Sequence, residues 1–210
     1  MPSADPSTDR ALQLLEHTGA IKSGHFLLSS GLHSANYCQC AALFEQPAVA
    51  SEIAHLLVAR LPASLEFDAV LAPALGGILW GYELTRALSA ARHKPVRSFF
   101  AERTTGEPFT LRRSFHLNPN DRVLLAEDVV TTGGSVMELV PLVESAGARV
   151  AAFAAVADRS KGKFKPAQPF FSLVQLDFPT YEPHACPLCA KGSTATKPGS
   201  RAAPAPQPAR

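Results

Sequence analysis

The chain has 210 residues, of which 46% are hydrophobic and 18% are charged. This length suits one α/β domain with a small appendage, and this composition excludes wholesale disorder. Because 20 Lys and Arg residues nearly balance 18 Asp and Glu residues, the charge does not indicate a nucleic-acid binder.

No segment has the composition of a targeting or membrane-spanning sequence. The first ten residues contain no apolar run, and the longest apolar strand candidate, residues 150–157, is too short to cross a bilayer. We therefore expect a soluble cytoplasmic protein that binds neither membrane nor nucleic acid. In that compartment its four cysteines would be reduced thiols or metal ligands.

Helices and strands are expected to alternate along the chain. In chain order they are a helix between residues 7 and 19, a strand at 21–28, a helix from 47 to about 61, a strand at 67–72, a helix from 76 through 88, a strand at 96–100, a loop or weak hairpin at 102–113, a strand at 122–126, a helix from 133 through 143, and strands at 150–157 and 170–176. Apolar strands without polar alternation, separated by helices, predict a mostly parallel sheet covered on both faces.

The segment VLLAEDVVTTGGS, residues 123–135, carries the strongest chemical pattern. Glu127 and Asp128 place two carboxylates at the C-terminal end of a buried strand, where open α/β sheets bind ligands. Carboxylates accept hydrogen bonds from vicinal hydroxyls, as on a ribose, and can lie near Mg²⁺. The TTGGS turn then opens a helix whose free N–H groups can bind a phosphate. The alternative is an ordinary strand–turn–helix, since GxxxxGK[ST] and GxGxxG are absent.

This segment resembles the phosphoribosyl-pyrophosphate (PRPP) signature of the type I phosphoribosyltransferases. The resemblance implies their α/β fold, a central mostly parallel sheet with helices on both faces and a small hood built from both ends of the chain. In that family the two acids bind the ribose hydroxyls and the following turn binds the 5′-phosphate. The implied PRPP-binding residues are Ala74, Leu75, Gly76, Gly77, Arg103, Glu127, Asp128, Val129, Val130, Thr131, Thr132, Gly133, Gly134 and Ser135.

Five further segments are similar to those of orotate phosphoribosyltransferases, in particular a short-loop bacterial branch. They are GHFLLSSGLHSANYCQ at 24–39 (hood), APALGG at 72–77 (pyrophosphate loop), FAERTTGEPFTLRRSF at 100–115 (catalytic loop), ADRS at 157–160 (orotate contact) and CPLCAKGSTATKPGSR at 186–201 (C-terminus). Together the resemblance covers residues 10–201.

The resemblance implies transfer of the 5-phosphoribosyl group from PRPP to N1 of orotate. The products would be orotidine 5′-monophosphate and pyrophosphate, in the de novo biosynthesis of pyrimidines and UMP. It also implies Mg²⁺ as cofactor, held through PRPP or pyrophosphate with help from Glu127 and Asp128, and a homodimer in which each mobile loop reaches the neighbouring site.

Orotate carries a carboxylate, which a guanidinium or backbone N–H groups recognise best. Arg159 follows a buried strand and suits this role, with a surface salt bridge as the alternative. Tyr37 can stack on the pyrimidine ring. Thr131 is an orotate contact by resemblance.

The predicted catalytic loop, residues 102–113, contains neither Lys nor His, which longer-loop members of the family carry. Its cations are Arg103, Arg112 and Arg113. Arginine stabilises charge but is a poor proton donor at neutral pH. We assign the catalytic role to Arg103 together with Glu127 and Asp128.

Cys186 and Cys189 have the CxxC spacing of a zinc knuckle, and His184 lies two residues before them. Cys38 and Cys40 would complete four ligands of a structural zinc ion if the hood approaches the C-terminus. The alternative is four reduced thiols without metal.

The expected organisation is a hood segment at 1–45, a phosphoribosyltransferase core at 46–165, a C-terminal strand and CxxC segment at 166–190, and a tail at 191–210. The tail is rich in Ala, Pro, Ser and Thr without apolar periodicity, which predicts disorder.

Two other functions stay open at this stage. One is a phosphoribosyltransferase for another base, although a neutral purine offers no carboxylate to Arg159. The other is a regulator that uses this fold as a PRPP sensor. The intact acids and the TTGGS turn favour catalysis over the sensor.

Overall fold

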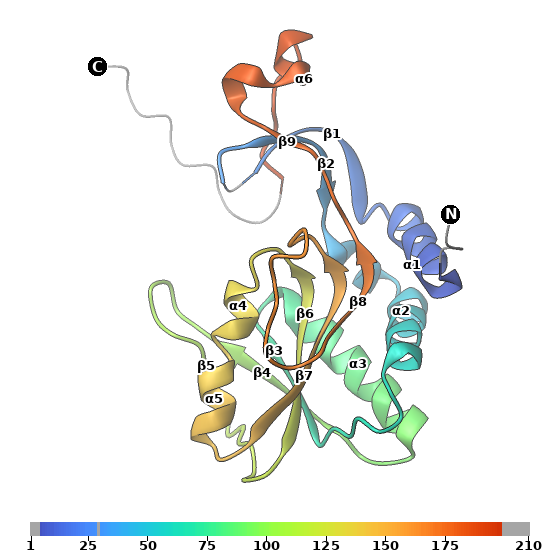
Figure 1. Cartoon of the computed structure of the whole chain (residues 1–210), viewed down its shortest axis with the longest axis vertical. Coiled ribbons are helices and arrows are strands. Elements are labelled where there is room, and N and C mark those ends of the chain that lie inside the picture. Colours follow the sequence, from blue (N-terminus) through green and yellow to red (C-terminus); the bar gives the residue numbers. More distant parts are fainter. Residues whose placement is uncertain (1–4, 29, 199–210) are drawn as a thin grey trace.

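The centre of the fold is a six-stranded sheet with strand order β5-β4-β3-β6-β7-β8 (Figure 1). The computed structural model describes residues 5–28 and 30–198. The strands of this sheet are β3 (Ala69–Pro73), β4 (Arg97–Glu102), β5 (Thr110–Leu111), β6 (Arg122–Val130), β7 (Arg149–Asp158) and β8 (Phe170–Gln175). Every pair is parallel except β4–β5. The predicted fold class is confirmed, and the weak hairpin is the pair β4–β5.

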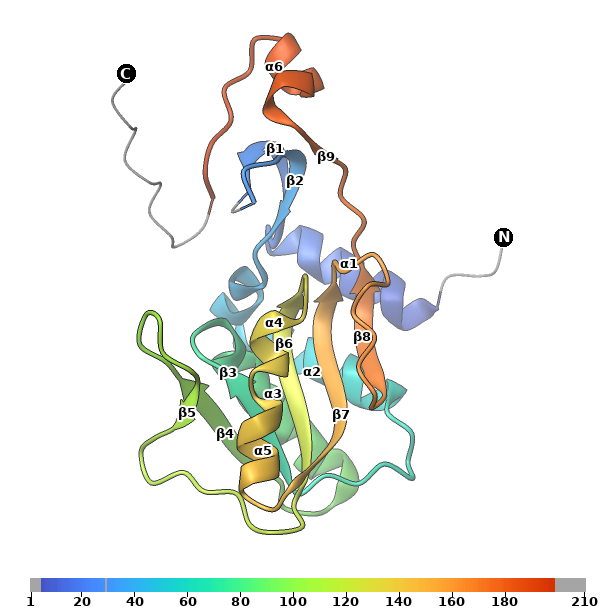
Figure 2. The same cartoon turned by 60° about the vertical axis from the view of Figure 1, so that its left-hand side comes forward.

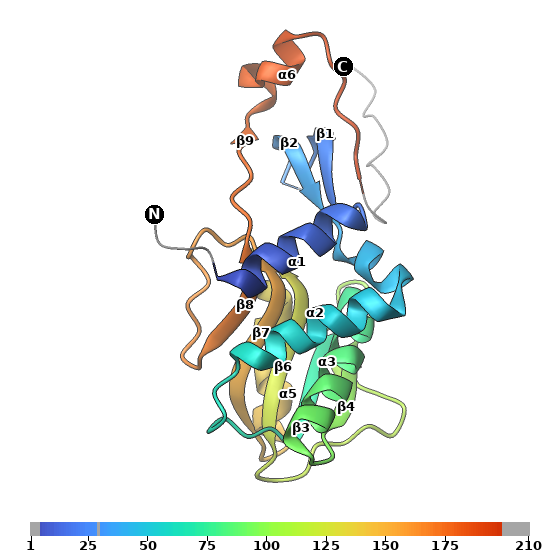
Figure 3. The same ribbon diagram turned by 90° about the vertical axis from the view of Figure 1, so that its right-hand side faces the viewer.

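Helices cover both faces of the sheet. Helices α1 (Pro6–His17), α2 (Pro47–Arg60) and α3 (Gly76–Arg92) lie on one face, as Figure 3 shows, while the short helices α4 (Gly134–Met137) and α5 (Val140–Ser145) lie on the other (Figure 2). Within β3, Val70 contacts the first group and Leu71 the second, and both are fully buried. Burial on both faces explains why the strand sequences are apolar without alternation.

The small hood stands above the C-terminal ends of β6 and β7 (Figure 2). It contains the antiparallel strands β1 (Ile21–Leu27), β2 (His33–Cys38) and β9 (Thr180–Tyr181), followed by the 3-10 turn η2 (Pro183–Ala185) and helix α6 (Pro187–Ala190). A second 3-10 turn, η1 (Cys40–Glu45), leads from β2 into α2. The hood therefore joins the two ends of the chain, as predicted.

Two expected elements differ in the structure, and strand β2 was not expected. The helix expected through residue 143 is split into α4 and α5, because Pro141 has no N–H to donate to the carbonyl of Met137. Strand β6 continues to Val130, so Glu127 and Asp128 lie inside the strand. Strand β2 was not predicted, since its polar sequence HSANYC is stabilised by pairing with β1 and β9.

The segment 191–198, predicted to be disordered, is instead hydrogen-bonded to the hood. Thr196 N–H donates to the carbonyl of His25 over 2.9 Å, and its own carbonyl accepts from Leu27 N–H over 2.8 Å. These bonds satisfy the backbone of β1 at an exposed strand edge. The rest of the predicted tail, 199–210, lies outside the described residues. No described helix is both long enough and apolar enough to cross a membrane.

Candidate active site

A cleft of about 910 Å³ lies between the hood and the C-terminal edge of the sheet. Several predicted site residues line it: Tyr37, Leu75, Gly76, Asp128, Val129, Thr131, Thr132 and Arg159. The remaining predicted residues, Ala74, Gly77, Arg103, Glu127, Val130, Gly133, Gly134 and Ser135, do not line it. The place of each of these eight residues in the fold decides whether it can still contact a ligand bound in the cleft.

The Asp128 carboxylate faces the cleft beside the start of α3. It accepts a hydrogen bond from Val129 N–H over 3.0 Å. Burial raises the pKa of Asp128, with two backbone hydrogen bonds acting in the opposite direction. A Cβ added at Gly76 would lie 3.2 Å from both carboxylate oxygens, so glycine lets the α3 backbone approach this acid without pushing its side chain aside.

The Glu127 side chain lies on the other face of the sheet, because successive side chains of a strand alternate. Burial raises the pKa of Glu127 to about 7, and the neighbouring Asp128 charge adds to that rise. Hydrogen bonds from Ser135 and from the Val136 N–H oppose the shift, as does the charge of Arg103. Glu127 is therefore directed to the TTGGS turn, and Asp128 to the cleft.

The predicted contact between Glu127 and PRPP implies that kcat/KM for PRPP increases with pH near pH 7. The ionised form accepts a stronger, charge-assisted hydrogen bond from a ribose hydroxyl than the protonated form does, so kcat/KM for PRPP should rise as pH passes through about 7. Stability should change in the opposite sense. The folded state keeps this proton above the ordinary pKa of 4.5, so stability contributed by Glu127 falls as pH rises from 4.5 toward 7.

Glu127→Gln is the comparison for both profiles, since substrate ionisation affects wild type and variant equally. The variant should lose the rising limb in kcat/KM and the fall in Tm over that pH range. Identical profiles for the two proteins would remove Glu127 from PRPP binding.

The TTGGS turn places hydroxyls and N–H groups beside the cleft. Thr131 and Thr132 are exposed, and Gly134 N–H donates to Thr132 Oγ1 over 3.3 Å. Gly133 has φ +79°, and a Cβ added there would lie 2.1 Å from Cδ2 of Phe164. The turn thus depends on glycine at residue 133 both for its backbone conformation and for the space that Phe164 fills.

Tyr37 lines the cleft from β2 of the hood, and Arg159 lines it from the end of β7. The Arg159 guanidinium lies 5.3 Å from the centroid of the Phe178 ring, and its backbone N–H donates to the carbonyl of Val130 over 2.7 Å. Burial raises the pKa of Tyr37, against which the Arg159 charge acts. Val130 itself is buried in the core, so it holds Arg159 by its backbone.

The segment 74–77 has two separate roles. Leu75 and Gly76 reach the cleft, whereas a Cβ added at Gly77 would lie 3.0 Å from Pro73 and 3.1 Å from Ala72. Gly77 therefore allows α3 to pack against β3. This packing role is the alternative to the predicted contact between Gly77 and PRPP. The Ala74–Leu75 peptide bond is cis.

Arg103 lies at the start of the loop between β4 and β5, outside the cleft. Its guanidinium donates to Glu138 over 2.6 Å and lies 4.3 Å from the centroid of the Phe109 ring. Arg113, just after β5, forms a two-pronged pair with Glu102, with both distances 2.9 Å. Arg103 is near enough to affect Glu127 electrostatically.

Sequence reasoning missed several cleft residues that follow Arg159. Ser160 is buried, and its hydroxyl has no hydrogen-bond partner among the described residues. Lys161 pairs with Asp177 over 2.6 Å, and Lys163 and Lys197 also line the cleft. The basic sequence RSKGK was the available signal. These cations suit a ligand with several negative charges.

The structure corrects the predicted set of four cysteine ligands. Cys38 and Cys40 line the cleft with their sulfur atoms 3.7 Å apart, whereas Cys186 and Cys189 lie in the hood beside His25 and His33. The pairs are separated because β2 runs from the hood down to the core before it reaches Cys38. A hydrogen bond from Cys40 lowers the pKa of Cys38, and the same contact together with burial raises the pKa of Cys40 well above its usual value.

Comparisons with known proteins agree with this geometry. The family model described as "Phosphoribosyl transferase domain" matches residues 39–184. The crystal structure of Mycobacterium tuberculosis orotate phosphoribosyltransferase in complex with inorganic phosphate has a TM-score of 0.66 at 22% identity, covering 82% of this chain and 97% of that one. An adenine phosphoribosyltransferase from Thermoanaerobacter pseudethanolicus has a TM-score of 0.61 at 18% identity, covering 78% and 99%. The fold defines a phosphoribosyltransferase but does not select the base.

The relatives that are similar in sequence indicate which base it is. The orotate phosphoribosyltransferase of Thermotoga maritima is 46% identical over 189 residues, covering 90% of this chain and 97% of its own. That of Novosphingobium aromaticivorans is 46% identical over 198 residues, covering 93% and 98%. The chain belongs to the orotate phosphoribosyltransferase family, and its role is therefore in pyrimidine biosynthesis.

Proposed function

We propose that this chain transfers the 5-phosphoribosyl group of PRPP to N1 of orotate, with orotidine 5′-monophosphate and pyrophosphate as products. The observation that carries the proposal is a single cleft that combines a carboxylate for ribose hydroxyls, Asp128, with a helix-start turn for phosphate and a guanidinium for the orotate carboxylate, Arg159. Each group is the preferred partner of one part of the two substrates.

In this proposal the N1–C1 bond forms as the bond from C1 to the pyrophosphate oxygen breaks, with inversion at C1, and the proton of N1 is lost to water or to the departing pyrophosphate. Asp128 and Glu127 hold the ribose hydroxyls, and the turn from Val129 to Ser135 holds the 5′-phosphate. Tyr37, Thr131 and Arg159 position orotate. Catalysis rests on positioning and charge stabilisation, with no covalent intermediate.

The two acids fit a divalent cation. Burial raises the pKa of both Glu127 and Asp128, so a bound positive charge would offset the cost of ionising them in this site. Carboxylate oxygens are ligands that Mg²⁺ accepts. We propose that Mg²⁺ binds mainly through PRPP or pyrophosphate, with help from Glu127 and Asp128, and neutralises the charge of the leaving group.

Arg103 is proposed to stabilise the departing pyrophosphate. Closure of the β4–β5 loop would exchange its pair with Glu138 for the substrate charge and would exclude water. Arg103→Ala is expected to lower kcat by about a hundredfold, the effect of removing one charge-stabilising group, while changing KM for orotate little. Steady-state kinetics of Arg112→Ala, an exposed arginine directly after β5, should show a smaller loss of kcat. Unchanged kcat in Arg103→Ala would remove Arg103 from the chemistry.

The homodimer and the cytoplasmic location stay predictions. Tyr82 of α3 is 58% exposed and lies outside the cleft lining, so it is an apolar side chain that a dimer contact would bury.

Competition between bases tests the proposed function. Orotate, uracil and adenine at equal concentration, with PRPP and Mg²⁺, should yield orotidine 5′-monophosphate as the dominant nucleotide. A dominant adenine nucleotide would identify a phosphoribosyltransferase for another base. Binding of PRPP without any product would favour the sensor.

A further inference from the structure

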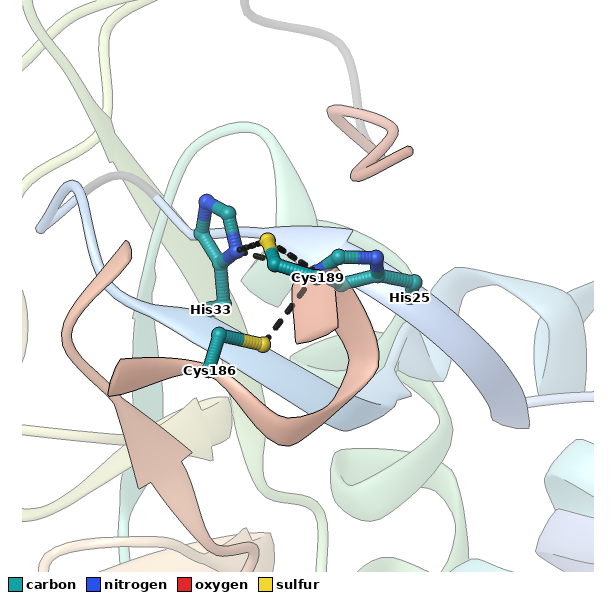
Figure 4. A group of neighbouring side chains, drawn as sticks. All are labelled: His25, His33, Cys186 and Cys189. Carbon is teal, nitrogen blue, oxygen red and sulfur yellow. Dashed lines mark hydrogen bonds between the residues drawn. The ribbon is translucent and has the colours of Figure 1, made fainter. Parts of the chain in front are cut away.

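Two histidines of the β1–β2 hairpin face two cysteines of the C-terminal segment (Figure 4). The ligand atoms of His25, His33, Cys186 and Cys189 all lie within 4.8 Å of one another. We propose that these four side chains bind one structural zinc ion. This site is separate from the cleft, whose lining contains none of the four.

Three of the distances between the ligand atoms match a tetrahedral site. Zinc bonds of about 2.3 Å to sulfur and about 2.0–2.1 Å to nitrogen place tetrahedral ligand atoms about 3.3–3.8 Å apart. His25 Nε2 lies 3.5 Å from Cys186 Sγ and 3.8 Å from Cys189 Sγ, and His33 Nδ1 lies 3.4 Å from Cys189 Sγ. The two ring nitrogens are 2.9 Å apart, so they would separate by a few tenths of an ångström.

The donor set favours zinc. Two thiolates and two imidazoles are ligands that zinc accepts, and four protein ligands leave no open position for a substrate. The other ring nitrogen of His25, Nδ1, lies 3.2 Å from Ser193 Oγ. Such an outer hydrogen bond fixes the ring orientation and leaves Nε2 free to bind the metal. Three of the four ligands, His25, His33 and Cys186, are buried, as is usual for a structural site, while Cys189 is exposed at the hood surface.

The site would connect three parts of the hood. His25 lies on β1, His33 on β2, and the two cysteines flank and enter α6. A two-stranded hairpin is marginally stable by itself, so a metal that joins it to the C-terminal segment would supply much of its stability. Leu27, Leu28 and Lys197 line the cleft from these same segments. Zinc would therefore hold in place the hood segments that line the substrate cleft.

Metal content is the direct test. The full chain, purified without chelator, should contain about one zinc per chain. Cys186→Ser/Cys189→Ser should lose the zinc, whereas His184→Ala, an adjacent exposed histidine outside the cluster, should keep it. Substoichiometric zinc in wild type that does not rise when zinc is added would overturn the proposal, as would full retention in the double variant.

Cobalt exchange keeps the test independent of variant folding. Wild-type protein stripped with chelator and loaded with Co²⁺ should show the visible absorption of a tetrahedral site with thiolate ligands, and zinc should remove it. The chelated form should unfold at a lower temperature than the zinc form. An octahedral cobalt spectrum, or an intact mass two hydrogens lower with Cys186 and Cys189 joined as a disulfide, would contradict the site.

Discussion

Asp128→Asn is expected to lower kcat/KM for PRPP by about a hundredfold while leaving the protein as stable as wild type or slightly more stable. The carboxylate can accept a charge-assisted hydrogen bond from a ribose hydroxyl, whereas the amide keeps one uncharged acceptor. Losing about 3 kcal/mol, the upper end for one hydrogen bond to a charged group, corresponds to about a hundredfold. Stability should not fall, because burial already disfavours the ionised form of Asp128 and raises its pKa.

This combination distinguishes a binding role from a structural one. Steady-state kinetics and thermal unfolding of the same preparation measure both effects, with Asp9→Asn as the control for an exposed acid on α1. A variant that loses Tm in proportion to activity would show that Asp128 maintains the fold. A variant with wild-type kcat/KM would remove it from PRPP binding.

Gly133→Ala is expected to lower the free energy of unfolding by about 2–4 kcal/mol and to weaken PRPP binding. The φ of +79° strains any residue with a side chain, and the new methyl would overlap Phe164. Phe164 has little room to move, because its ring contacts Phe153 and Phe170 with centroids 5.6 Å and 5.0 Å away.

Gly19→Ala separates the effect of backbone strain at positive φ from the effect of overlap with the Phe164 side chain. Gly19 has φ +68° after α1, and no atom lies within 4 Å of its added Cβ, so this substitution should cost about 1 kcal/mol. Phe164→Leu should recover part of the stability lost in Gly133→Ala, which denaturant unfolding of the double variant would show. Equal losses at Gly133 and Gly19 would mean that overlap with Phe164 has no effect.

The sequence was sufficient to predict those strands whose signals lie within the strand and its immediate neighbours. Apolar runs flanked by glycine or proline predicted β3, β6 and β7, because strands buried on both faces must be apolar throughout. Strand β2 could not be found in this way, since its stability depends on pairing with β1 and with a segment about 145 residues away, as in the Ser34 bond to the Pro179 carbonyl.

The same limit applies to the site. The adjacent acids were recognised, but their separation onto two faces depends on β6 continuing to Val130. The CxxC was recognised as half of a metal site, but its partners were predicted wrongly. His25 and His33 flank the hairpin turn, and only the position of α6 above that turn shows that they, and not Cys38 and Cys40, face the CxxC.

The central claim is tested most directly by following orotate and pyrophosphate together in one reaction with PRPP and Mg²⁺. The account predicts that each orotate consumed gives one orotidine 5′-monophosphate and one pyrophosphate. Folded protein that binds PRPP but forms no orotidine 5′-monophosphate, or that releases pyrophosphate without consuming orotate, would contradict it.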